Sequence, residues 1–220
     1  MKYYIFYPSM NKKIVGCYHQ TDNIIFPIDL YMPPYNGCFQ KGEFLDFDPE
    51  IKIMLHRKAK ITDFIDGRTL GFGIIVNEKV KIILESFNLP PHKYHPIELF
   101  QEDIKYLGYH WLHFFVDLYN FIDVKKSLFE VIDENEQEVI LIDNIKSDNQ
   151  MCSIFKKYKY PNYINIKALY FDSKMPNYDL FSDNIGKDYN YMSERLVDYI
   201  NENNITGLDF KEAIKLYFEK

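Results

Sequence analysis

The sequence predicts an α+β fold in which a mixed or antiparallel β-sheet packs against a few helices. Short runs of β-branched and aromatic residues recur along the chain, which is typical of strands. Two other segments carry apolar residues at helical spacing behind a capping residue. With 220 residues, 47% of them apolar, the chain is long enough to bury a hydrophobic core. We therefore expect a single domain that spans residues 1–220.

The first helix has clear start and stop signals. Asn77 is placed to cap its N-terminus, and Glu78 favours the positive end of the helix dipole. The helix is expected to stop before Pro90 and Pro91. Its apolar stripe is Val80, Ile83, Leu84 and Phe87.

A second helix is expected to begin at Ser193, which is the candidate cap, with Glu194 in the first turn. Its apolar stripe is Leu196, Tyr199 and Ile200. Gly207 lies just beyond this helix, where a chain reversal is favourable. Residues 209–220 are interpreted as a third helix, whose buried side would be Phe210, Ala213, Ile214 and Tyr217.

Strands are expected in six further segments. These are residues 3–7, 14–18, 109–118, 121–131, 138–142 and 164–171. Turns or polar connections are expected at residues 33–37, 42–49, 133–137 and 157–162. Residues 1–60 are thus a strand- and loop-rich N-terminal part, and residues 61–220 form the expected core.

The two capped helices lie in similar settings, which raises the hypothesis of two related strand–helix halves. A shift of 179 − 63 = 116 residues places Asp63 on Asp179 and Glu78 on Glu194 without a gap. Each copy reads acid, two apolar residues, strand, capped helix, short turn and aromatic residue. The alternative is that any two strand–helix units look alike. The sequence therefore raises an internal repeat of residues 62–94 and 178–210.

Composition narrows the function classes. The net charge of -6 disfavours nucleic acid as a partner, because phosphates would be repelled. Cys17, Cys38 and Cys152 are far apart, which argues against a disulfide framework or a structural zinc site. The 19 tyrosines suit interface anchors, although an A+T-rich genome would enrich the same residue types. No segment has the character of a signal peptide or a membrane-spanning helix, so we expect a cytoplasmic protein without a membrane partner.

Histidine pairs raise a metal hypothesis. His92 and His95 are three residues apart, and so are His110 and His113, whereas zinc needs three or four converging ligands. Residues three apart on a strand point to opposite faces, so His110 and His113 would diverge in an extended segment. The arrangement of His92 and His95 after the two prolines stays open. Surface or packing histidines are the alternative.

Carboxylates gather in two predicted loops. Glu43, Asp46, Asp48 and Glu50 lie in the first, and Asp133, Glu134, Glu136 and Glu138 lie in or beside the second. Acid–base catalysis needs carboxylates whose pKa values are split by burial, whereas carboxylates in polar loops stay solvated and ionised. We therefore interpret these runs as acidic patches for a basic partner. No G-x-S-x-G or phosphate-loop motif is present, so neither a catalytic residue nor a cofactor is assigned.

Four segments together carry a family resemblance. They are residues 75–80, 121–127, 192–196 and 206–210, which read IVNEKV, FIDVKKS, MSERL and TGLDF. In these motifs the chain resembles a bacterial family first catalogued as a domain of unknown function and now described as immunity proteins of polymorphic toxin systems. The resemblance covers residues 60–212, and Asn77 stands where the first helix start of the family pattern has Ser.

The resemblance implies a protein that binds and neutralises a cognate toxin by occlusion, without catalysis. It carries over motif positions and no catalytic residue: Asp123, Ser127, Ser193, Glu194 and Arg195. Ser193 is expected to cap a helix, and Glu194 or Arg195 to tie the helix end to its neighbour, with partner contact as the alternative. From exposure and composition, the expected contacts to the toxin are Glu43, Asp46, Asp48, Glu134, Glu136, Tyr158 and Tyr160. The rival hypotheses are a metal-dependent enzyme that uses the four histidines and a regulatory protein-binding module.

Overall fold

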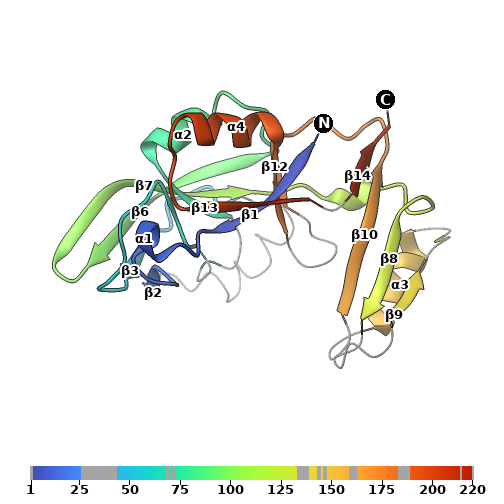
Figure 1. Cartoon of the computed structure of the whole chain (residues 1–220), viewed down its shortest axis with the longest axis horizontal. Coiled ribbons are helices and arrows are strands. Elements are labelled where there is room, and N and C mark those ends of the chain that lie inside the picture. Colours follow the sequence, from blue (N-terminus) through green and yellow to red (C-terminus); the bar gives the residue numbers. More distant parts are fainter. Residues whose placement is uncertain are drawn as a thin grey trace.

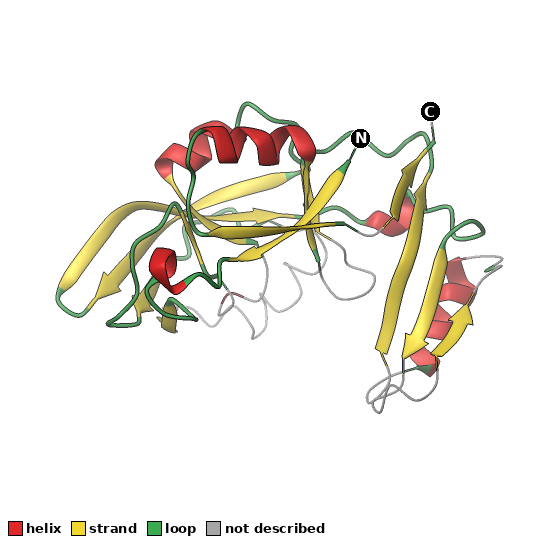
Figure 2. Ribbon diagram, viewed as in Figure 1, coloured by secondary structure: helices red, strands yellow, loops and turns green. Residues whose placement is uncertain are grey.

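The computed structural model describes residues 2–25, 44–67, 70, 73–132, 139–142, 145, 148–158, 163–182, 189–213 and 215–219. Within these residues the strands form three sheets, and two helices lie together on one side of the larger part of the molecule (Figures 1 and 2). Mixed and antiparallel sheets with separate helices confirm the predicted α+β class.

The largest sheet has six strands in the order β2-β3-β6-β7-β5-β4. They are β2 (Thr21–Ile25), β3 (Ile51–Leu55), β6 (His92–Gln101), β7 (Ile104–Phe114), β5 (Ile74–Asn77) and β4 (Phe64–Ile65). β3 and β6 run parallel, and the other neighbours run antiparallel. Alternate side chains therefore face two different cores. Ile53, Leu99 and Trp111 contribute to one core, while Val76 and Leu112 contribute to the other.

The N-terminal strand lies inside a second sheet, of order β11-β12-β1-β13. The strands are β11 (Leu180–Ser182), β12 (Asn190–Ser193), β1 (Tyr3–Pro8) and β13 (Leu208–Glu212). β1 pairs antiparallel with both β12 and β13. Tyr3 and Ile5 join one core, and Phe6 joins the core beneath the helices. The first residues of the chain therefore hold together segments from its C-terminal third.

A third sheet has the order β14-β10-β8-β9 and lies at the right of Figure 1. It consists of β14 (Lys215–Phe218), β10 (Tyr163–Phe171), β8 (Leu128–Ile132) and β9 (Val139–Ile142). The helix α3 (Asp148–Lys157) packs against the same core through Ile154. Phe129 and Phe171 share this core with Tyr3 of the second sheet. A short 3-10 turn, Leu118–Asn120, precedes β8.

The helices α2 (Glu78–Leu84) and α4 (Glu194–Glu202) begin where the sequence predicts. The Asn77 side chain accepts a hydrogen bond from the Val80 amide, and the Ser193 side chain accepts one from the Leu196 amide. Each bond satisfies an amide that the helix itself leaves unpaired, so both expected caps are confirmed. The two helices bury their apolar sides in one common core.

The two predicted strand–helix halves have matching backbone pairings. Phe64 pairs with Val76 across β4 and β5, and Leu180 pairs with Met192 across β11 and β12. Both partners differ by the same offset, since 180 − 64 = 192 − 76 = 116. Each pair of strands leads directly into a capped helix. A shared origin of the two halves stays a prediction.

The strand predicted at residues 14–18 is wrong, because this segment begins within the short helix α1 (Lys12–Val15). Asn11 caps the helix by accepting a hydrogen bond from the Lys13 amide, and Gly16 ends it with a φ of 81°. A Cβ atom at Gly16 would lie 2.1 Å from the carbonyl oxygen of Lys58, so only glycine fits this turn. The local cap signals outweighed the apolar run.

The third helix predicted at residues 209–220 is also wrong, because most of this segment lies in β13 and β14. Phe210 pairs with Phe6 of β1, and Leu216 pairs with Leu169 of β10. Free strand edges are strong templates for pairing and override a weak helical pattern. The strand predicted at 121–131 is shorter, since β8 begins at Leu128, and α3 was not predicted. Residues 33–37 and 133–137 lie outside the described residues.

Candidate binding surface

The motif at the start of α4 ties this helix to a buried carboxylate. Asp179, which has 0% of its surface exposed, accepts hydrogen bonds from the Ser193 hydroxyl at 2.6 Å and from Nε of Arg195 at 2.6 Å. A second guanidinium nitrogen of Arg195 forms an ion pair with the other carboxylate oxygen. The amide of Asn88, in the turn behind α2, donates to that oxygen at 2.8 Å. Asp179 therefore joins both helix ends.

The electrostatics of Asp179 follow from these contacts. Burial by itself would raise the pKa of the carboxyl, because it disfavours the charged form. The hydrogen bonds from Arg195, Ser193 and Asn88 outweigh burial and hold the pKa below its ordinary value. The carboxylate is thus ionised at neutral pH and acts as a structural anchor.

Asp63 occupies the equivalent place in the first half. Its carboxylate accepts hydrogen bonds from the Asn77 side chain at 2.8 Å and from the amide and hydroxyl of Thr206, both at 2.8 Å. Thr206 follows α4, so each aspartate is bound by the loop behind the helix of the other half. Burial opposes ionisation, but these bonds lower the pKa of Asp63 as well. Gly207, next in the chain, has a φ of 105° and lies against Phe64.

The remaining motif residues also make local contacts. The amide of Glu194 donates to the carbonyl of Lys2, while its side chain is exposed. The buried Ser127 hydroxyl donates to the carbonyl of Asp123 at 2.9 Å and accepts from the amide of Tyr170 at 3.0 Å. The Asp123 carboxylate accepts from the amide of Lys125 at 3.1 Å. These contacts are structural, and any contact of the motif with a partner stays a prediction.

The four histidines do not converge. His95 and His113 are buried on one face of the β6–β7 hairpin, where both rings stack on Trp111. His110 and His92 point to the other face, where His110 pairs with Glu78 at 2.5 Å. Burial, aided by nearby Lys93, lowers the pKa of His95 to about 4, so this ring is neutral at neutral pH. The predicted divergence of His110 and His113 is confirmed, and the described residues hold no cluster of three metal-ligand side chains.

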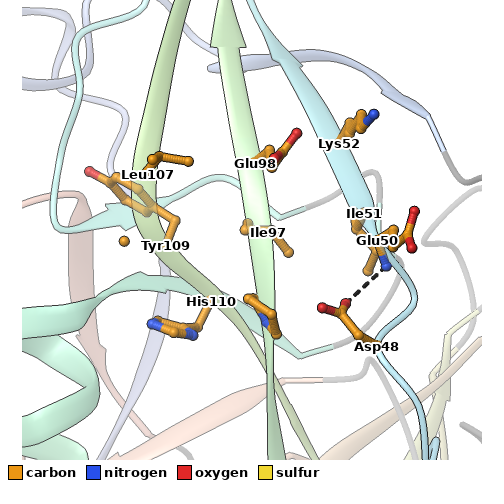
Figure 3. A pocket seen from close by; sticks show the side chains of 11 residues that line it. Asp48, Glu50, Ile51, Lys52, Ile97, Glu98, Leu107, Tyr109 and His110 are labelled. Atoms are coloured by element: carbon orange, nitrogen blue, oxygen red, sulfur yellow. Dashed lines mark hydrogen bonds between the residues drawn. The ribbon is translucent and has the colours of Figure 1, made fainter.

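A groove of about 340 Å³ crosses the face of the six-stranded sheet opposite Trp111 (Figure 3). Asp48 and Glu50 lie along one side of the groove, Leu107 and Tyr109 lie along the other, and His110 closes one end. The remaining lining comes from residues of β3, β6 and β7: Ile51, Lys52, Pro96, Ile97, Glu98 and Gly108. This site was not predicted, since three separate segments build it.

The expected contact residues fall into three groups. Asp46 and Asp48 are exposed in the loop before β3, and Asp48 lines the groove. Tyr158 is partly buried at the end of α3, packed against the core of the third sheet, with Nζ of Lys157 5.0 Å from the ring centroid. The others lie outside the described residues: Glu43, Glu134, Glu136 and Tyr160. The structure thus places one of these positions in a groove.

Comparison with known families identifies the chain. A family model described as an immunity protein family, Imm11, matches residues 2–215. The chain belongs to the Imm11 immunity protein family. The Imm11 match extends the resemblance, first seen over residues 60–212, into β1 and the N-terminal part. No curated protein matches the chain.

Among the described residues, no helix is both long and apolar enough to cross a membrane.

Proposed function

We propose that the chain binds a cognate toxin inside the producing cell and neutralises it by covering a surface that the toxin needs. The match of the Imm11 family to residues 2–215 carries this proposal. A net charge of -6 further suits a partner with a basic surface, because opposite charges accelerate association. The mechanism is steric and electrostatic, and no bond is made or broken on the chain.

The geometry supports binding over metal-dependent catalysis. The histidines proposed as metal ligands are divided between two faces of β6 and β7. Two motif residues, Ser193 and Arg195, are bound to Asp179, which also accepts from the Asn88 amide and so holds α4 against the turn behind α2. A rigid scaffold of this kind presents a preformed surface, which limits the entropy lost on binding. Acidic side chains of the loop before β3 supply the proposed contacts.

Co-expression with the toxin encoded beside its gene tests the proposal. We expect the chain to protect cells from that toxin and to co-purify with it. Occlusion also predicts a stoichiometric titration, in which toxin activity falls linearly and vanishes at one equivalent of chain when both concentrations exceed the Kd. Inhibition by far less than one equivalent would indicate turnover and contradict occlusion. The absence of both a complex and protection would refute the proposed function.

A further inference from the structure

The groove that crosses β3, β6 and β7 is a hollow in one face of the six-stranded sheet. At Gly108 the φ of 80° marks an irregularity of β7, and a Cβ atom there would meet nothing within 4 Å. The pairing of β6 with β7 shifts register at this point, between Ile97 and Leu99. The irregular backbone leaves the β7 side of the groove bare at Gly108 and turns Leu107 outward. Another chain can therefore approach the backbone closely here.

Leu107 provides an apolar contact beside Gly108. Its exposed fraction is 69%, which is the highest value for a large apolar side chain among the described residues. Ile82 on α2 is similarly exposed, at 60%, but it does not line the groove. An exposed aliphatic side chain at the rim of a hollow is suited to bury against a partner.

The charges on the lining select the kind of partner. Three carboxylates, of Asp48, Glu50 and Glu98, line the groove with a single lysine, Lys52, which leaves a net charge of 1 − 3 = −2 without His110. Glu98 is already paired with Lys105, which lies outside the groove. Within the described part of the chain, no ion pair involves Asp48 or Glu50. These two carboxylates remain available to a cationic group.

The Asp48 carboxylate and the backbone of Glu50 are held in position before any partner arrives. A carboxylate oxygen of Asp48 accepts a hydrogen bond from the Glu50 amide at 2.9 Å, the dashed line in Figure 3. Glu50 adopts a φ of 49°, an uncommon conformation that this turn stabilises. β3 begins at the next residue and is bonded to β6, so the acidic side of the groove is fixed to the sheet. Binding then loses little conformational entropy.

We infer that this groove is the surface that contacts the toxin, and that it receives a protein segment carrying lysine or arginine beside an aliphatic or aromatic side chain. The cation would lie between Asp48 and Glu50, and the apolar side chain would pack on Leu107. This inference rests on the proposed function, because it names the contact surface of the same complex.

Charge-altering variants and matched controls test the inference. D48K/E50K reverses both carboxylates, and D48N/E50Q removes the charges while it keeps an acceptor for the Glu50 amide. The control D198K/E202K makes the same charge change on the exposed side of α4, where neither residue lines the groove. For the apolar contact, L107S is compared with I82S, because neither substitution changes the charge. Unchanged circular dichroism and thermal unfolding would establish that each variant folds.

The readout is the Kd and the association rate with the toxin encoded by the neighbouring gene, at two or more salt concentrations. We expect D48K/E50K to weaken binding about a hundredfold, and D48N/E50Q and L107S about tenfold each. The association rate of D48K/E50K should also lose most of its dependence on ionic strength. Both controls should bind as the wild type does.

The outcomes separate the two proposals. If the wild type binds the toxin and the groove variants bind it equally well, the groove is not the contact surface. The same holds if the control variants are weakened as much as the groove variants. Either result would leave the proposed immunity function standing. A wild-type chain that neither binds nor protects would instead overturn the proposed function. Selective weakening of the groove variants supports both.

Discussion

Replacing Asp179 by alanine removes the hydrogen-bond acceptor that connects the start of α4 to the turn behind α2. The carboxylate is fully buried and receives hydrogen bonds from Ser193, from Arg195 and from the amide of Asn88. Without it, the Asn88 amide and the Ser193 hydroxyl lose their partner, and Arg195 loses its counter-ion. Asp63→Ala is the matched control, because Asp63 has the equivalent position but only uncharged donors.

The expected loss of stability follows from the burial of these groups. Removing one partner of a buried ion pair costs about 3–5 kcal/mol. The Arg195 side chain is 58% exposed, so water can solvate the guanidinium after the substitution and the cost falls to about 3 kcal/mol. The Asp63 substitution should cost about 1–2 kcal/mol, because its partners are neutral and it is only half-buried. For a chain of this size, about 3 kcal/mol lowers the Tm by about 10 °C.

Urea unfolding followed by the fluorescence of Trp111, the only tryptophan, measures both variants. Equal slopes against urea would show that the variants unfold as the wild type does. The reasoning is refuted if Asp179→Ala loses less than about 1 kcal/mol, or no more than Asp63→Ala.

Acid supplies a second readout of the same anchor. Because the pKa of Asp179 is lowered in the folded state, its ionised form adds stability above the unfolded pKa of about 3.9. This contribution is lost as the pH falls through the lower folded pKa. The side chain introduced by Asp179→Asn cannot titrate. The free energy of unfolding of this variant should therefore fall less than that of the wild type when the pH is lowered from about 5 to about 2. An identical acid profile for the two proteins would contradict the assignment.

Three further substitutions test separate features by the same unfolding assay. The folded pKa of His95 is about 4, so acidification from about pH 6.5 favours the unfolded state by up to about 3 kcal/mol. His95→Phe should therefore reduce the dependence of the free energy of unfolding on pH in this range. An unchanged pH dependence would exclude His95 as its source. Ser127→Ala leaves the Tyr170 amide without its acceptor and should cost about 1–3 kcal/mol, whereas a neutral result would argue against that bond. Gly207→Ala places a Cβ atom 2.1 Å from the Phe64 carbonyl oxygen at a residue whose φ is 105°. The substitution should lower the free energy of unfolding by about 2–4 kcal/mol. A loss below about 0.5 kcal/mol would show that the turn can relax.

The two capped helices, α2 and α4, could be predicted because their signals are local. Asn77 and Ser193 lie next to the amides they cap, so their role depends on a few neighbouring residues. The strands at residues 3–7 and 164–171 were also predicted, since β-branched and aromatic residues are concentrated there. The segment at 209–220 was not predicted, because short apolar runs suit helix and strand alike and long-range pairing decides between them. The segment at 14–18 was not predicted either, because the cap at Asn11 and the turn at Gly16 outweigh its apolar run.

The candidate surface was only partly predictable. Asp48 was expected to be exposed and acidic, and the structure places it at the groove. Leu107 and Glu98 were not singled out, because they lie on strands where apolar and charged side chains alternate. A glycine directly after Leu107 in an aromatic run was the one signal of an irregular strand.

The sequence by itself determined the fold class, the two capped helices, the negative charge and the family resemblance, because each depends on composition or on residues a few positions apart. Only the tertiary structure decided that Asp179 is bound by the turn behind α2 and that Asp63 is bound by the turn behind α4. It also decided that Asp48 and Leu107 line opposite sides of one groove. The residues brought together are 59 to 143 positions apart, as 107 − 48 = 59 for the groove and 206 − 63 = 143 for the Asp63 anchor. Their juxtaposition depends on which strand edges pair, and pairing is a property of the whole chain.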